Sequence, residues 1–253
     1  MKINRFLKAL ILGISVSLGF TQNPFELDSA LTSVLPQSIA NSIEIADVDN
    51  DGTQDIILTG YDSTRFGVFL DVINGNSDGT ISLGSQLRII TYTDTIANQI
   101  GGIGGIDLAD VNQDGFIDAY LTGSAQSNLY YNTNGEFLES SNLESMVLSY
   151  SDGKWGDVNM DGAPDLFIMG TDNFNDVIIN ELYINNGSKL DKDKTTIFPA
   201  LFNGSSAWGD YDNDGDPDLI ICGQTADKTA SVSRFYQKDP IGRLTELTTA
   251  DEV

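Results

Sequence analysis

Four short acidic segments contain the residues of this chain whose types and spacing can support metal chemistry. They read DVDNDGTQD (47–55), DVNQDGFID (110–118), DVNMDGAPD (157–165) and DYDNDGDPD (210–218). Oxygen-bearing side chains occupy positions 1, 3, 5 and 9 of each segment, and glycine at position 6 permits a tight bend. Carboxylates that converge in this way repel one another unless a cation lies among them. Calcium takes 6–8 oxygens in flexible geometry and suits such a loop better than magnesium, which requires a tighter octahedron.

The predicted ligands occupy the same positions in all four segments, which we call loops one to four. The side-chain ligands are Asp47, Asp49, Asp51 and Asp55; Asp110, Asn112, Asp114 and Asp118; Asp157, Asn159, Asp161 and Asp165; and Asp210, Asp212, Asp214 and Asp218. The carbonyl oxygens of the residues at position 7 complete the sets, namely Thr53, Phe116, Ala163 and Asp216. We therefore predict up to four calcium ions as cofactors. Loops one and four, with four carboxylates each, are expected to bind calcium more tightly than loops two and three, where position 3 is asparagine.

An EF-hand is the obvious alternative, and position 12 argues against it. That loop needs a bidentate glutamate at position 12 and a helix after it. Here position 12 is always apolar, and an apolar run typical of a strand follows; the residues are Leu58, Leu121, Ile168 and Ile221. Solvated Asp/Gly turns are a second alternative for any single loop. Four copies in one register favour the metal-binding interpretation.

Composition excludes several classes of function. The 253 residues include 13 Lys+Arg and 37 Asp+Glu, and the formal net charge of −24 argues against a nucleic-acid partner. Histidine is absent, which excludes His-based catalysis and His metal sites. A single cysteine, Cys222, excludes an intramolecular disulfide framework and a thiolate zinc cluster, and its apolar strand predicts a buried, inert thiol.

The first 22 residues have the build of a secretory signal peptide. Lys2, Arg5 and Lys8 precede an apolar run over 9–20, which is too short for a spanning helix of about 20 apolar residues. No later stretch approaches that length. We therefore expect an exported protein, secreted or held at the cell surface, with no membrane-spanning segment after removal of the signal peptide. The repeats are expected to fill residues 23–253.

Self-comparison extends each acidic loop into a longer repeat. A bulky residue stands two places before the first aspartate and a small residue one place before it, and an apolar strand and an Asn-Gly-type hairpin follow the loop. Sustained helical periodicity is lacking. Strand, acidic loop, strand and hairpin at about 50 residues per unit predict a β-propeller of four-stranded blades. Trp155 and Trp208 are expected to pack between blades, and 101–110 is expected to be a turn between strands rather than a phosphate-binding loop.

The D-x-[DN]-x-D-G-x-x-D loop before an apolar strand resembles the FG-GAP/VCBS repeat family, which is related to the integrin α-subunit propeller. The segment SSAWGDYDNDGDPDLIICG (205–223) is similar to the bacterial exported form of the repeat. The resemblance implies a β-propeller, usually of about seven blades, with one calcium loop per repeat. Only four loops are present here, and the first interval between loops is the longest. We expect a fragment or partial propeller of about four blades; a small propeller and one completed by another chain are the alternatives.

These features lead us to expect a non-enzymatic calcium-binding module that binds an extracellular protein or glycan. The adhesive role is implied by the resemblance and not by the residues themselves, because a fold alone does not fix function. One alternative is a propeller-fold polysaccharide lyase that uses a Lys or Tyr base and calcium as a Lewis acid. Another is a structural module that accompanies a catalytic domain.

Overall fold

The computed structural model describes residues 39–62, 67–91, 103–123, 126–172, 174–238 and 243–247. The described chain consists of strands and turns, without a helix, and the strands form four separate four-stranded sheets. The expected signal peptide, residues 1–22, lies outside the described residues.

Each sheet is built from four strands that follow one another in the chain and pair antiparallel with their neighbours. The first sheet consists of β1 (Ile39–Ala46), β2 (Asp55–Asp62), β3 (Gly67–Gly75) and β4 (Ile81–Thr91). The second consists of β5 (Ile103–Ala109), β6 (Asp118–Gly123), β7 (Asn128–Thr133) and β8 (Glu136–Glu139). The third consists of β9 (Leu148–Gly156), β10 (Asp165–Asp172), β11 (Val177–Asn185) and β12 (Leu190–Lys192). The fourth consists of β13 (Leu201–Gly209), β14 (Asp218–Thr225), β15 (Ser231–Lys238) and β16 (Leu244–Glu246).

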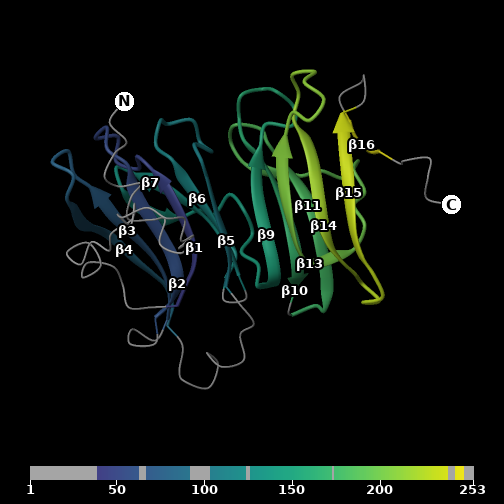
Figure 1. The fold of residues 1–253 in the computed structure, drawn as a ribbon, viewed down its shortest axis with the longest axis horizontal. Helices are drawn as coiled ribbons and strands as arrows, with labels where there is room; N and C mark the ends of the chain where they lie inside the picture. Colours follow the sequence, from purple (N-terminus) through teal and green to yellow (C-terminus); the bar gives the residue numbers. More distant parts are fainter. Residues whose placement is uncertain are drawn as a thin grey trace, which may run out of the picture.

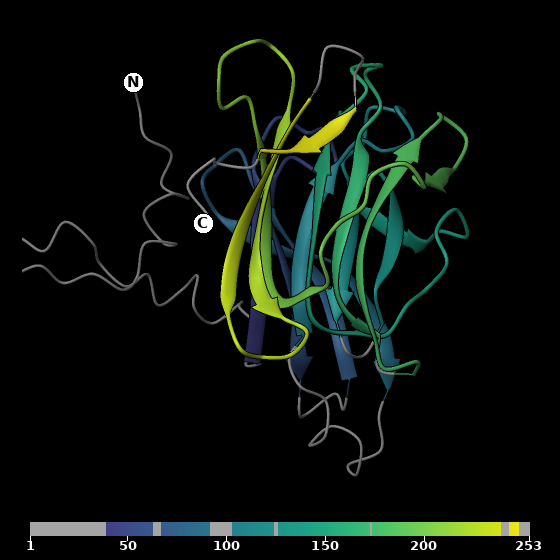
Figure 2. The same ribbon diagram turned by 90° about the vertical axis from the view of Figure 1, so that its right-hand side faces the viewer.

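The four sheets form an open array in sequence order. The first strands of consecutive sheets lie beside one another, β1 next to β5, β5 next to β9 and β9 next to β13. Figure 1 shows the first two sheets on the left and the last two on the right, and Figure 2 views the array from the side of the fourth sheet. This arrangement is a partial β-propeller with four blades, as the sequence predicts, and β1, β5, β9 and β13 are its inner strands.

The second strands of the second and third sheets are apolar on both faces because each face packs on a different sheet. In the third sheet, Leu166 and Ile168 pack against the second sheet, while Phe167 and Met169 pack against the fourth. The cluster between the first and second sheets follows the same rule, with Ile57 on one side and Leu121 on the other. The main cores of the molecule therefore lie between sheets.

Both tryptophans pack between sheets, as predicted from their fixed place before the loops. The Trp155 ring meets Tyr120 of the second sheet edge-on, with centroids 6.2 Å apart. The Trp208 ring lies against Gly156 of the third sheet, and its Nε1 donates to the carbonyl of Lys154 at 3.2 Å.

Two local predictions are wrong. Residues 103–109, expected to belong to a turn, form inner strand β5, because Ile106 is needed to fill the core against the first sheet. Cys222, expected to be buried, is exposed. It lies on the face of β14 that has no neighbouring sheet among the described residues.

Candidate metal centre

Every acidic loop joins the inner strand of a sheet to its second strand. Positions 1 to 8 lie between the two strands, and position 9 is the first residue of β2, β6, β10 or β14. Position 4 has φ between 58° and 60° in all four loops, and the glycine at position 6 has φ between 86° and 97°. Two left-handed residues so close together produce the tight bend, and they explain why glycine recurs at position 6.

The position 1 carboxylate organises each loop from its centre. Its two oxygens accept the N–H groups of positions 5 and 6 at 2.9–3.2 Å in every loop. The position 3 oxygen accepts the same position 5 N–H at 2.9–3.2 Å. Position 1 and position 3 oxygens therefore point to one place inside the loop, in the same way four times.

The position 5 carboxylate forms a small turn with position 7. Its Oδ1 accepts the position 7 N–H at 2.7–3.1 Å. In loop one, Thr53 also donates its hydroxyl to Asp51 at 2.6 Å, and this bond and the Thr53 N–H lower the pKa of Asp51. The proposed role of the position 7 carbonyl oxygens of Thr53, Phe116, Ala163 and Asp216 stays a prediction.

The position 9 carboxylate is buried and ties the loop to the sheet. Its Oδ2 accepts the position 2 N–H at 2.9 Å in all four loops. In the first three sheets its Oδ1 accepts an N–H at the end of the third strand at 2.8–2.9 Å, from Gly75, Asn132 and Asn185. Burial raises the pKa of Asp118 and Asp165 to about 6, and it also raises the pKa of Asp55 and Asp218.

Loops one and four bring three acidic side chains together. One carboxylate oxygen from each of Asp47, Asp49 and Asp55 lies within 4.8 Å of the others, as do oxygens of Asp210, Asp212 and Asp214 in loop four. Asp51 and Asp218 are outside these two groups. Such spacing is too close for unscreened like charges and matches the oxygen-rich shell that calcium prefers.

Loop four also contains acceptors that the described part of the protein leaves unused. Oδ1 of Asp216 and Oδ1 of Asp218 are buried and have no hydrogen-bond partner among the described residues. A buried acceptor without a partner is costly, and a bound cation would satisfy it. Gln237 of β15 donates its amide to Oδ2 of Asp212, whose Oδ1 accepts the Asp214 N–H, so both oxygens of that carboxylate already have a partner. The donor set of loop four fits a hard divalent cation.

Loops two and three carry less charge at their centres. Nδ2 of Asn112 donates to Oδ2 of Asp114 at 2.9 Å, and Nδ2 of Asn159 donates to Oδ2 of Asp161 at 2.9 Å. These amides remove part of the repulsion that would otherwise favour a cation. The difference supports the predicted order of affinity, in which loops one and four bind more tightly.

Neighbouring loops are also joined to one another, which the sequence did not predict. Nδ2 of Asn50 in loop one donates to the carbonyl of Gly115 in loop two, and Nε2 of Gln113 in loop two donates to the carbonyl of Gly162 in loop three, both at 2.9 Å. The donors occupy position 4, and the acceptors occupy position 6. Met160, at position 4 of loop three, has no such donor. The sequence feature that could have indicated these bonds is the side-chain amide at position 4, in Asn50 and Gln113.

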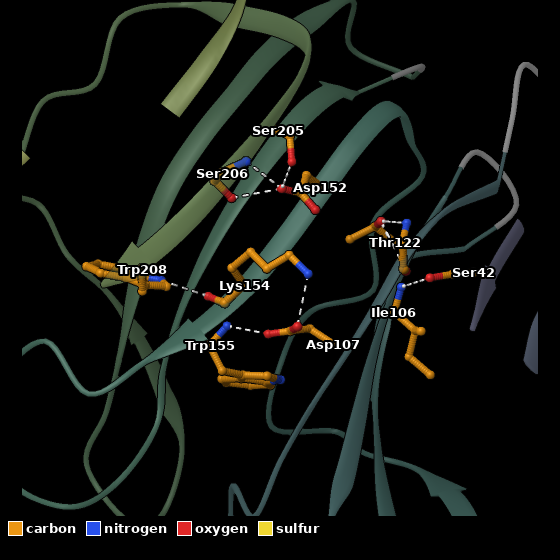
Figure 3. A network of polar contacts seen from close by, with 11 residues as sticks. Ser42, Ile106, Asp107, Thr122, Asp152, Lys154, Trp155, Ser205, Ser206 and Trp208 are labelled. Carbon is orange, nitrogen blue, oxygen red and sulfur yellow. Dashed lines mark hydrogen bonds and ion pairs between the residues drawn. The ribbon is translucent and has the colours of Figure 1, made fainter. Parts of the chain in front are cut away.

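A second set of polar contacts joins the inner strands (Figure 3). Main-chain N–H groups on the unpaired edge of one inner strand are satisfied by side chains of the preceding one. Ile106 N donates to Ser42 Oγ at 3.3 Å, Trp155 N donates to Asp107 Oδ2 at 2.8 Å, and Ser206 N donates to Asp152 Oδ2 at 2.6 Å. These contacts stabilise the packing of adjacent blades.

One ion pair completes this second set of contacts. Lys154 Nζ lies 3.0 Å from Asp107 Oδ1, with both side chains partly buried. Burial lowers the pKa of Lys154, but the hydrogen bond and the charge of Asp107 outweigh it and leave the pKa raised. The lysine is thus held in its charged form. Sequence reasoning missed this pair because its members are 47 residues apart.

Comparisons with known proteins agree with the repeat pattern. A family model described as an FG-GAP-like repeat matches residues 110–168 and 157–221. No curated protein sequence matches the chain significantly. The crystal structure of a protein from Lactobacillus plantarum matches 83% of this chain and 84% of its own at 12% identity and a TM-score of 0.26, and at that level it carries no conclusion.

None of the described residues forms a helix long and apolar enough to cross a membrane.

The family match spans loops two, three and four, and loop one has the same geometry. Residues 110–221 of the chain match the FG-GAP-like repeat family.

Proposed function

We propose that this protein is an exported, calcium-binding propeller module that binds an extracellular protein or glycan and catalyses no reaction. The observation that carries the metal assignment is the fourfold recurrence of one loop geometry. In each loop, positions 1 and 3 direct oxygens to a common point and position 9 closes the loop from the sheet. Solvated turns that share no ligand would not be expected to adopt the same arrangement in all four loops.

Calcium is the cation that suits these donors best. All of the proposed ligands are oxygens, as hard cations require, and histidine is absent from the sequence. The loops are exposed around position 5 and buried at position 9, so an ion would enter from solvent and be closed off by the sheet. Magnesium holds its water more tightly and demands a regular octahedron, which a loop with four or five protein oxygens fits less well.

The proposed role of calcium is to stabilise the stack of sheets. An ion in a loop would neutralise carboxylates of the loop together with the carboxylate that begins the second strand. If each site binds at about 10 μM and meets millimolar calcium, each ion adds about 2.7 kcal/mol to the free energy of unfolding. Four sites would add roughly 11 kcal/mol, comparable with the net stability of a whole domain. Calcium would thus replace the disulfides that an exported protein often uses.

The non-enzymatic part of the proposal is supported by the state of the titratable groups. Lys154, a candidate base for a lyase, is charged and paired with Asp107. A lyase base must instead accept a proton from the substrate. Screening acidic polysaccharides for unsaturated products tests this part directly. We expect no product, and product formation would contradict the proposal. A separate array of extracellular proteins and glycans would identify the binding partner.

Isothermal titration of the metal-stripped protein with calcium tests the metal assignment. We expect up to four ions per chain, little heat with magnesium, and loss of one ion in each single variant at position 1, such as Asp47→Ala or Asp110→Ala. The site lost in the Asp47→Ala variant should be one of higher calcium affinity than the site lost in the Asp110→Ala variant. Near-ultraviolet circular dichroism in calcium verifies that each variant keeps its fold. Absence of calcium binding in the folded wild-type protein would overturn the proposal.

A further inference from the structure

Inner strand β13 contains a bulge formed by Asn203 and Gly204. The pairing of β13 with β14 shifts between Phe202 and Ser205, so these two residues stand opposite a single residue of β14. Asn203 is exposed and has a φ of 52°, in the left-handed region that asparagine tolerates better than most residues. A Cβ on Gly204 would lie 1.8 Å from the carbonyl oxygen of Cys222, so only glycine fits there. The bulge therefore contains an Asn-Gly dipeptide whose asparagine faces solvent.

Asparagine is a chemically labile side chain, and a following glycine makes it more so. The main-chain nitrogen of the next residue can attack the side-chain carbon Cγ, and glycine places no Cβ in the way. Ammonia leaves and a five-membered succinimide forms. Water then opens the ring, either to aspartate or to isoaspartate, in which the backbone runs through the former side chain. A hydrogen bond that holds the glycine N–H or the asparagine amide slows the attack.

The sequence contains four Asn-Gly dipeptides, and in three of them a side chain holds the glycine N–H. In each of the three it donates to a side-chain oxygen at 2.8–3.0 Å; the pairs are Gly75 with Asp55, Gly135 with Asn132, and Gly187 with Asn185. The Asn186 amide is held as well, since its Nδ2 donates to Asp191 at 2.8 Å. These three glycine nitrogens are therefore directed away from the asparagine that precedes them.

The fourth dipeptide, Asn203-Gly204, lacks such restraints. Among the described residues, no side-chain oxygen accepts the Gly204 N–H and no hydrogen bond involves the Asn203 amide. The repeat does not require asparagine here, because Tyr150 occupies the equivalent place in β9 with a φ of 51° and is followed by Ser151. The fourth sheet thus has a reactive dipeptide where the third sheet has none.

We propose that Asn203 is a site of spontaneous covalent modification, at which the protein converts its own asparagine to aspartate or isoaspartate. The Gly204 nitrogen loses its proton to solvent, bonds to Cγ of Asn203 and releases the side-chain nitrogen as ammonia. One water molecule then opens the succinimide and leaves a carboxylate. The reaction needs no oxidant, reductant or second protein, and it does not depend on calcium binding or on the proposed function.

The modified residue would act on the junction between the third and fourth sheets. Two and three residues further along β13, Ser205 Oγ and Ser206 N donate to Oδ2 of Asp152 in β9 at 3.1 and 2.6 Å (Figure 3). Isoaspartate at 203 lengthens the backbone just before these donors, and either product adds a negative charge to their strand. Modification is therefore expected to loosen this junction as the protein ages.

The test is peptide mapping by mass spectrometry after incubation of the full chain at mildly alkaline pH in calcium-containing buffer. In the folded protein, Asn203 should lose its amide at least about fivefold faster than Asn74, Asn134 or Asn186, which is about the factor that one retained hydrogen bond supplies. In urea the four rates should converge, because every site then has only its neighbouring glycine to distinguish it. A folded protein in which Asn203 reacts no faster than the other three overturns the proposal.

The variant Asn203→Tyr is the matched control, because tyrosine occupies the equivalent bulge of β9. Near-ultraviolet circular dichroism verifies that the variant is folded before incubation begins. Ageing should make the fourth sheet of the wild-type protein progressively more sensitive to limited proteolysis and leave the variant unchanged. An equal gain of sensitivity in both proteins would overturn the claim that modification of Asn203 loosens the junction.

Discussion

The side chain of Asn50 in the first loop reaches across to the second sheet, where its Nδ2 donates to the carbonyl oxygen of Gly115 at 2.9 Å. Gln113 repeats the bond toward Gly162 at the same distance. The first three loops are therefore joined in a row by bonds between position 4 and position 6. The fourth loop is outside this row because Met160 has no donor.

This row predicts that calcium sites in adjacent loops influence each other. We expect Gln113→Ala to weaken calcium binding at both loop two and loop three about two- to tenfold, since an exposed hydrogen bond contributes about 0.5–1.5 kcal/mol. Met160→Ala, at the equivalent exposed position, should leave all affinities unchanged. Titration calorimetry on the two variants decides the point. Equal affinities in the Gln113→Ala variant and the wild-type protein would show that the bond does not couple the sites.

Gly156 and Gly209 occupy the same repeat position and should respond differently to a methyl group. A Cβ on Gly156 would lie 2.6 Å from the Trp208 ring, whereas a Cβ on Gly209 meets nothing within 4 Å. Gly156→Ala is therefore expected to lower the free energy of unfolding by about 1–3 kcal/mol. Gly209→Ala should change it by no more than about 0.5 kcal/mol. Thermal melts that show equal losses would mean that Trp208 does not pack on Gly156.

The contacts of Asp107 should stabilise the junction of the second and third sheets. Asp107→Ala removes the acceptor of the Trp155 N–H and the partner of Lys154. We expect it to cost about 1–3 kcal/mol, and Asp107→Asn to cost less because an amide oxygen still accepts the N–H. Asp191→Ala, which breaks the exposed pair with Lys189, should cost less than about 1 kcal/mol. Denaturant unfolding measures all three, and an Asp107→Ala variant as stable as Asp191→Ala would contradict the assignment.

The buried position 9 carboxylates predict an unusual pH dependence for the metal-stripped protein. Their folded pKa, about 6 for Asp118 and Asp165, exceeds the unfolded value of about 4. Between these values the folded state binds protons that the unfolded state does not, so these two groups stabilise the fold below pH 4 and lose that effect as the pH rises through 6. The metal-stripped protein should therefore melt at a lower temperature at pH 7 than at pH 5.

Calcium should reverse this trend, since it binds the ionised carboxylates and competes with protons. Melting temperatures at pH 5 and pH 7, with and without calcium, provide the measurement. The double variant Asp118→Asn, Asp165→Asn is the control and should show a flatter dependence without metal. A metal-stripped wild-type protein whose melting temperature rises from pH 5 to pH 7 would contradict the prediction.

Much of the fold could be predicted because the repeat shows it four times. The strand, acidic loop, strand and hairpin pattern yields the four four-stranded sheets, and the fixed place of Trp155 and Trp208 predicts packing between them. The turn predicted at 101–110 is wrong for residues 103–109, which form β5, because the local glycine content does not reveal the neighbouring sheet. Ile106 fills a core that only the assembled array creates.

The remaining errors and omissions have the same origin. Cys222 lies on an apolar strand whose pattern predicts burial, and its exposure depends on which sheet follows, which a single repeat does not reveal. The Lys154–Asp107 pair and the Asn50–Gly115 bond each join residues of different repeats. Loop ligands, in contrast, lie within nine consecutive residues, so their convergence follows from local spacing.

The most direct test of the account is the melting temperature of the metal-stripped protein before and after addition of 2 mM calcium. If four ions add roughly 11 kcal/mol, the melting temperature should rise by at least about 20 °C, because each kcal/mol shifts a chain of this size by about 2–4 °C. Magnesium at the same concentration should produce a much smaller rise. An unchanged melting temperature in calcium, together with no uptake of the ion at equilibrium, would contradict the claim that these loops are metal sites that stabilise the propeller.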